Sequence, residues 1–162
     1  MGHVALAAFI LLFAPGIQAQ SQLRSYFNVN AQGLWVEGYD PVAYFIDKRA
    51  MKGKPEFTTN YKGATFHFTT KTHYELFRLE PEKYLPQYGG YCAYALGANN
   101  EKVEVDPETF KIIEGKVYLF YNAFFNNTNS QYRNPSATIA AEPPSWMPGT
   151  LLLRPWSRRW MR

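Results

Sequence analysis

The chain has one cysteine, Cys92, in a segment that could do chemistry at sulfur. Residues 81–95 read PEKYLPQYGGYCAYA, and the two glycines before Cys92 would let backbone approach the thiol closely. A thiolate binds soft metal ions such as Cu(I). A lone cysteine is also often a small buried hydrophobic residue. In an exported protein an odd cysteine can be redox-active or pair between molecules, so the residues alone leave three alternatives.

Two histidines could complete a metal shell around this sulfur. His67 and His73 lie in the body of the chain, and imidazole is a ligand that copper accepts. Cys92, His67 and His73 are therefore the candidate metal ligands, with a copper ion as the expected cofactor. Their spacing matches no Cys-x-x-Cys type of motif. The alternatives are an exposed strand position for His67 and a solvated place in the first helical turn for His73.

The sequence predicts no enzyme. It has no Gly-x-Ser-x-Gly motif, no phosphate-binding loop, no His-Glu-x-x-His motif and no Ser-His-Asp pattern. Asp40 stands before Pro41, and we expect it to cap a short helix rather than to act as a base or a ligand. Six tyrosines could line an aromatic pocket or could simply fill the core: Tyr39, Tyr44, Tyr84, Tyr88, Tyr91 and Tyr94.

A β-hairpin and a helix must position the two histidines. Residues 57–68 contain two β-rich runs separated by Lys62-Gly63, a sequence that suits a tight turn. Alternation places Ala64, Phe66 and Phe68 on one face and His67 on the other. A helix follows, with Thr70 as one possible N-cap or with Thr72 and Glu75 as a capping box.

The rest of the chain alternates short helices and strands. Pro81 ends the first helix, and Gly97 is predicted to stop a two-turn helix that contains Cys92. Further short elements are expected at residues 82–85 (helical) and at residues 103–105, 110–113 and 116–122 (strands), with a turn at Glu114-Gly115. Residues 123–149 are polar and are expected to be helical in part, ending against Trp146.

These elements predict a small α+β domain of short antiparallel β-hairpins packed with short helices. The 162 residues suffice for one domain with a proper core. We divide the chain into a signal peptide at residues 1–19, a domain at residues 24–149 and a basic tail at residues 150–162.

The N-terminal segment predicts export. Its apolar run covers residues 4–14, which is shorter than the about 20 residues of a membrane-spanning helix. Pro15 and Gly16 follow the run, and small Ala19 suits signal-peptide cleavage. We therefore expect a periplasmic or secreted protein with no stable membrane span after cleavage.

The charge distribution argues against a nucleic-acid partner. Of the 17 basic residues, four arginines lie in the tail, which leaves 13 basic and 13 acidic residues elsewhere. The body is therefore neutral, whereas nucleic-acid binding needs a basic face. A metal ion or a small ligand is the expected partner, and the sequence names no protein partner.

Several separated motifs resemble the exported single-domain branch of the YHS-domain family. In order they are GYDPVAYF, a Lys-Gly spacer, YKGATFHFTT, PEKYLPQYGGYCAYA and VDPETFKIIEGKVYLFYN. The resemblance runs from about Gly38 to Trp146, where IAAEPPSWMPG looks like the ending of that branch, and it excludes the tail. It is specific because the motifs agree in order and in spacing.

The resemblance implies a role in metal binding, copper first, because YHS domains resemble modules attached to copper-transporting ATPases and to some multicomponent hydroxylases. The cysteine position of the family is Cys92 here, and no family role transfers to His67. The sequence thus predicts metal binding through Cys92 with histidine help. The alternatives are a metal-free binding or interaction module with an aromatic pocket and Cys92 in the core, and a thiol redox accessory.

Overall fold

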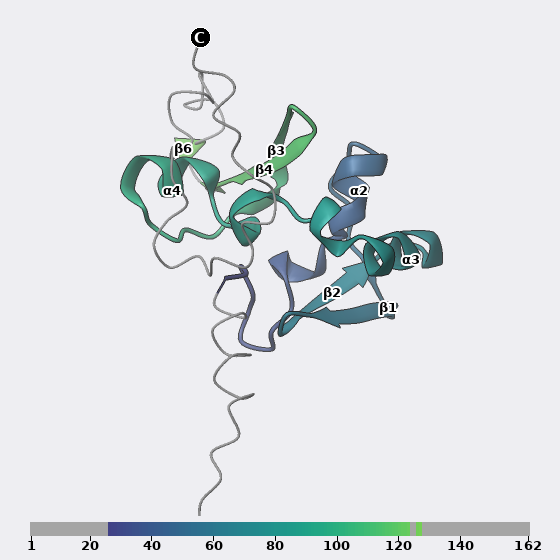
Figure 1. Cartoon of the computed structure of the whole chain (residues 1–162). Coiled ribbons are helices and arrows are strands. Elements are labelled where there is room, and N and C mark those ends of the chain that lie inside the picture. Colours follow the sequence, from purple (N-terminus) through teal and green to yellow (C-terminus); the bar gives the residue numbers. More distant parts are fainter. Residues whose placement is uncertain (1–25, 124–125, 128–162) are drawn as a thin grey trace, which may run out of the picture.

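A computed structural model of the chain describes residues 26–123 and 126–127 (Figure 1). The predicted signal peptide, the basic tail and all of the polar segment at residues 123–149 except residues 123, 126 and 127 lie outside the described residues. The described part is a small α+β domain with two antiparallel two-stranded hairpins and three short α-helices, which confirms the predicted fold class. None of its helices is long and apolar enough to cross a membrane.

The first hairpin consists of β1 (Lys54–Tyr61) and β2 (Ala64–Phe68). Its turn lies at Lys62 and Gly63, whose φ angles are +48° and +81°. Two successive positive φ angles match the right-handed twist of the flanking strands, so the predicted turn is confirmed. The ladder is irregular between Lys54 and Thr58, where β1 bulges away from β2.

Two helices pack beside this hairpin, α2 (Pro41–Ile46) and α3 (Lys71–Leu79). The N-cap of α3 is Thr70, whose hydroxyl accepts the backbone N–H of the third helical residue at 3.1 Å. The alternative capping box of Thr72 and Glu75 is therefore wrong. Thr72 already lies inside the helix and is exposed.

A run of short helical elements follows, η2 (Pro81–Lys83), η3 (Gln87–Gly90) and α4 (Ala93–Asn99). The first begins one residue earlier than predicted and is shorter. Gly97 does not stop α4, because the helix continues to Asn99 and is capped by Asn100, which adopts the left-handed conformation at φ +58°. Asparagine tolerates this conformation and can end a helix in place of glycine.

The second hairpin consists of β3 (Asp106–Ile113) and β4 (Lys116–Phe120), joined at Glu114 and Gly115 as predicted. Residues 103–105 form no strand, because β3 begins after them. The predicted strand at residues 110–113 is the end of β3. β4 stops before residue 121, and a separate small ladder follows, made of β5 (Asn122–Ala123) and β6 (Asn126–Asn127).

The main core lies between the inner face of β2 and the helix α3. Ala64, Phe66 and Phe68 are fully buried, as the alternation predicts. The ring centroid of Phe77 on α3 lies 4.9 Å from that of Phe66 and 5.2 Å from that of Phe68. Aromatic contacts at these separations stabilise the domain beyond simple burial of area.

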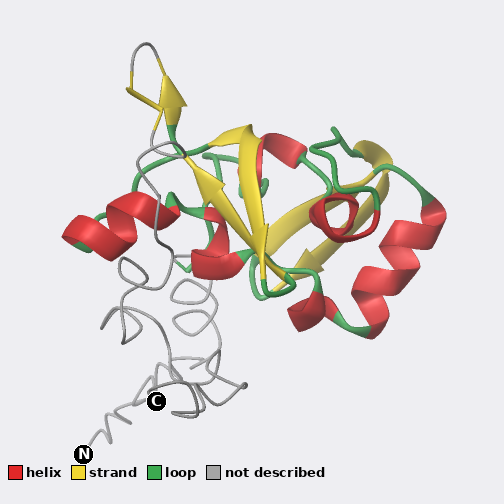
Figure 2. Cartoon of the chain, turned by 90° about the horizontal axis from the view of Figure 1, so that it is seen from above, coloured by secondary structure: helices red, strands yellow, loops and turns green. Residues whose placement is uncertain are grey.

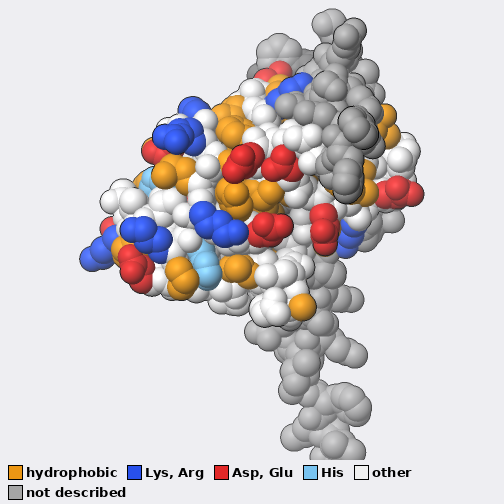
Figure 3. Space-filling view, turned by 180° about the vertical axis from the view of Figure 1, so that it is seen from behind, with side chains coloured by type: hydrophobic (Ala, Val, Ile, Leu, Met, Phe, Trp, Pro, Cys, Tyr) orange, Lys and Arg blue, Asp and Glu red, His pale blue; other side chains and the backbone are white. Residues whose placement is uncertain are grey.

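A second core lies at the other end of the domain, where α4 packs near β4 (Figure 1, Figure 2). Its buried members are Tyr88, Ala93, Leu96, Tyr118 and Phe120. The outer surface carries basic and acidic side chains close together (Figure 3).

The N-terminal segment packs against Gly89 and Gly90 at two left-handed turns. Val36 and Gly90 both have positive φ, at +36° and +94°, and they lie in η1 (Val36–Gly38) and η3. A Cβ on Gly90 would meet Val36 Cγ2 at 2.8 Å, and a Cβ on Gly89 would meet the carbonyl oxygen of Tyr26 at 2.2 Å. The two glycines thus allow the N-terminal segment to pack closely against them. The sequence had suggested instead that they allow backbone to approach the thiol of Cys92.

Candidate functional site

Asp40 is the centre of a buried polar cluster. It is fully buried and caps α2 as predicted, because its Oδ1 accepts the backbone N–H groups of Val42 at 2.8 Å and Ala43 at 3.3 Å. Proline at the first helical position suits this start, since its missing N–H would have no partner there.

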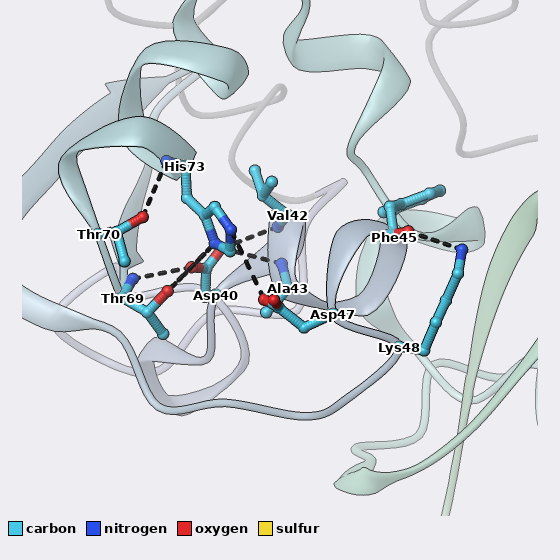
Figure 4. Close-up of polar contacts among 9 residues, drawn as sticks. All are labelled: Asp40, Val42, Ala43, Phe45, Asp47, Lys48, Thr69, Thr70 and His73. Atoms are coloured by element: carbon cyan, nitrogen blue, oxygen red, sulfur yellow. Dashed lines mark hydrogen bonds and ion pairs between the residues drawn. The ribbon is translucent and has the colours of Figure 1, made fainter.

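The other carboxylate oxygen of Asp40 reaches the start of α3. Its Oδ2 accepts the backbone N–H and the hydroxyl of Thr69, both at 2.8 Å, and the Nδ1–H of His73 at 2.7 Å (Figure 4). With five donors, the carboxylate is satisfied without water. One side chain therefore joins α2 to the beginning of α3.

His73 is buried at 7% exposure, so the solvated first-turn position weighed for it is wrong. The side of α3 that carries it packs against α2, which is why the imidazole is covered. Its Nε2 lies 3.6 Å from Oδ2 of Asp47, whose side chain is 36% exposed (Figure 4). We call these residues, Asp40, Thr69, His73 and Asp47, the His73 cluster.

The environment of Cys92 differs from that of the His73 cluster. It is fully buried at the residue before α4, and its Sγ accepts the backbone N–H of Tyr121 at 3.3 Å. Its own N–H donates to the carbonyl oxygen of Val103 at 3.0 Å. These contacts agree with a small buried residue that fixes the start of α4.

His67 is half-buried on the outer face of β2, opposite the aromatic core, as the alternation predicts. Partial burial lowers the pKa of His67 below its ordinary value of 6.5, and the charge of Lys52 lowers it further. Its imidazole packs over Gly38, where a Cβ would lie 3.2 Å from Nδ1.

The three predicted ligands, Cys92, His67 and His73, do not form a common site. In residues 26–123 and 126–127, no three His, Cys, Asp or Glu side chains are grouped so that they could hold a metal ion. His73 is the histidine that lies beside carboxylates. These belong to Asp40 and Asp47, which form no metal-binding motif in the sequence.

Neither of two pockets in the described part of the chain, one beside α3 and one beside the N-terminal loop, is lined by the six tyrosines. Tyr44, Tyr84 and Tyr88 are buried in the cores, and the hydroxyl of Tyr44 donates to the carbonyl oxygen of Pro107 at 2.8 Å. A pocket of about 240 Å³ lies instead between the bulge of β1 and α3. Its lining is Glu56, Phe57, Thr58, Lys71 and Tyr74.

Sequence reasoning missed Asp47 and Thr69. One signal could have found Asp47, because it follows α2 directly and stands seven residues after Asp40, at the opposite end of one short helix. No comparable signal marks Thr69, which meets Asp40 only through packing of the hairpin against α2.

Comparison with known proteins identifies one family. The YHS domain family model matches residues 42–88, the stretch from α2 to η3 that includes His67 and His73 and ends before Cys92. No curated protein and no solved structure matches the chain. The chain therefore contains a YHS domain, at residues 42–88.

Proposed function

We propose that this YHS domain binds one divalent transition-metal ion, copper first, through His73 and Asp47. The observation that carries the proposal is the pair of donor atoms Nε2 and Oδ2, 3.6 Å apart at the edge of the cluster. This distance is too long for an N–H···O hydrogen bond. Two donors that share an ion at about 2.0 Å lie about 3.4 Å apart in a tetrahedral site and about 2.8 Å apart at neighbouring positions of a tetragonal Cu(II) site, so the exposed side chain of Asp47 must move closer to His73 to bind copper.

The orientation of the imidazole supports the same role. Metal-bound histidines usually donate their second ring N–H to a carboxylate, which fixes the tautomer and raises the basicity of the ligating nitrogen. Asp40 is such a partner, since it accepts from Nδ1 of His73 at 2.7 Å and is itself fully buried. Nε2 is then left facing Asp47.

The donor types favour copper in its divalent state. A nitrogen and a carboxylate oxygen suit Cu(II), which binds such sites more tightly than Zn²⁺ does. The sulfur of Cys92, which would favour Cu(I), is buried with a backbone N–H directed at it. The proposal thus keeps the metal of the sequence prediction and moves its ligands from Cys92 to the His73 cluster.

A second function is favoured by the burial of Cys92 and by the full hydrogen bonding of Asp40. In this case the His73 cluster only joins α2 to α3, and the YHS domain is a metal-free binding or interaction module. We propose binding rather than catalysis under either reading. We also propose a periplasmic or secreted location, on the pattern of residues 1–19.

Titration of the full chain with Cu(II) distinguishes these functions. We expect about one ion per chain, with electron paramagnetic resonance showing nitrogen coupling from an imidazole. Asp47→Asn should weaken binding about tenfold or more, because the exposed carboxylate is one of only two protein ligands. Asp47→Asn is a better test than His73→Gln, because His73→Gln also removes buried hydrogen bonds and could destabilise the fold.

Two control variants complete the copper experiment. His67→Gln, a matched change at the other histidine of the domain, should leave affinity unchanged, and so should Cys92→Ala. Loss of copper binding in Cys92→Ala but not in Asp47→Asn would show that Cys92, and not the His73 cluster, binds the metal. No binding by the wild-type chain would leave the metal-free module.

A further inference from the structure

A small notch lies between the N-terminal loop and the segment that leads to β3. Its volume is about 110 Å³, which is the space of a few water molecules or the end of one side chain. The walls are partly aliphatic, from Val29, Val36, Val105 and Pro107, and the remaining lining residues are Asn28, Asn30, Glu37 and Glu104.

The rim of this notch is acidic. Glu37 is exposed, and its described ion pair is a 4.0 Å contact with exposed Lys52. Glu104 is exposed too, and no ion pair to it occurs in the part of the chain that the structure describes.

The space-filling view from behind shows both acidic and basic side chains on one face (Figure 3). Acidic side chains gather near its centre, with apolar side chains between them (Figure 3). A surface of this kind suits a ligand that presents an aliphatic group next to a cation.

The chain itself contains such a segment outside the described residues. Residues 150–162 read TLLLRPWSRRWMR, in which three leucines directly precede Arg154. The tail carries four arginines and no acidic residue, while the rest of the chain is neutral, so the whole excess positive charge lies there. Residues 128–149 join the tail to β6, and such a linker can span up to about 70 Å.

We propose that residues 151–154 dock into this notch of the same chain. A leucine side chain contacts Val36 and Val105, and the guanidinium of Arg154 lies between the carboxylates of Glu37 and Glu104. Docking covers aliphatic surface and pairs the acidic rim with the segment that carries the excess positive charge of the chain.

Methyl-labelled full chain tests this docking by nuclear magnetic resonance. We expect nuclear Overhauser contacts between the methyl groups of residues 151–153 and those of Val36 and Val105. The double variant Glu37→Gln/Glu104→Gln should remove these contacts, because it deletes the charges and keeps the size of the side chains. The matched variant Glu56→Gln/Glu75→Gln changes two exposed glutamates elsewhere and should keep them.

Three results would overturn the docking. The first is absence of the methyl contacts in the wild-type chain. The second is their persistence in Glu37→Gln/Glu104→Gln with an otherwise unchanged spectrum. The third is a contact seen only between differently labelled chains, which would place the tail of one molecule in the notch of another. None of these outcomes depends on copper binding at the His73 cluster.

Discussion

At the scale of single residues, Asp40 and Cys92 show how burial decides chemistry. Asp40 is buried and charged, and it is stable there because five donors surround its carboxylate. Cys92 is fully buried as well, and its Sγ accepts the backbone N–H of Tyr121. The carboxylate can therefore orient a neighbour that reaches the surface, whereas the thiol has no exposed atom with which to react.

The burial of Cys92 predicts a slow reaction with thiol reagents. Attack requires opening of the domain, and an unfolding free energy of about 5 kcal/mol would slow it by roughly a thousandfold or more relative to unfolded chain. The measurement compares the rate of a chromogenic disulfide reagent on native chain and on chain in denaturant. Equal rates would show an accessible thiol and would favour the redox accessory.

At the scale of elements, the left-handed turns differ in what surrounds them. The turns at Gly63 and Gly115 only reverse the chain within a hairpin. The turn at Gly89 instead contacts residues distant in sequence. Trp35 Nε1 and the N–H of Asn28 both donate to the carbonyl oxygen of Gly89, at 2.9 Å and 3.1 Å. Two glycines of similar φ therefore differ in what surrounds them.

This difference predicts unequal costs for two alanine substitutions. Gly115→Ala should lower the free energy of unfolding by about 1–2 kcal/mol, the cost of a left-handed L-residue, because nothing lies within 4 Å of its new Cβ. Gly89→Ala should cost clearly more, since its Cβ would lie 2.2 Å from the carbonyl oxygen of Tyr26. Urea unfolding of both variants measures the gap, and equal costs would mean that the N-terminal segment does not dock there.

At the scale of the whole molecule, the two core clusters and the charges on the surface determine stability. In the described domain the buried aspartate and the buried histidine, Asp40 and His73, bond to each other. His67 differs, because it is half-buried on the outside of the domain, and both this burial and the charge of Lys52 lower its pKa. Its protonation therefore opposes folding.

The lowered pKa of His67 predicts a loss of stability in acid. Above its ordinary pKa of 6.5 the imidazole is neutral in both states and has no effect. As the pH falls below that value, the unfolded chain binds the proton first, so the free energy of unfolding falls until the folded pKa is passed. His67→Gln should therefore lose less stability than wild type between about pH 7 and about pH 5. Parallel urea curves at each pH measure this, and identical losses would contradict it.

The sequence by itself determined the local structure of the domain. The Asp-Pro start of α2, the Lys62-Gly63 turn and the inward face of Phe66 and Phe68 depend on neighbours within a few residues, so pattern and propensity suffice to predict them. The overall α+β class follows from the sum of such segments.

Only the tertiary structure decided which side chains meet. His73 bonds to Asp40 across 33 residues of sequence, Gly89 receives Trp35 across 54, and Cys92 lies beside Tyr121 across 29. Such contacts depend on how helices and hairpins pack, and the alternation of residue types along one element carries no information about a distant partner. The sequence therefore pointed to the cysteine, and packing brought the histidine to the carboxylates.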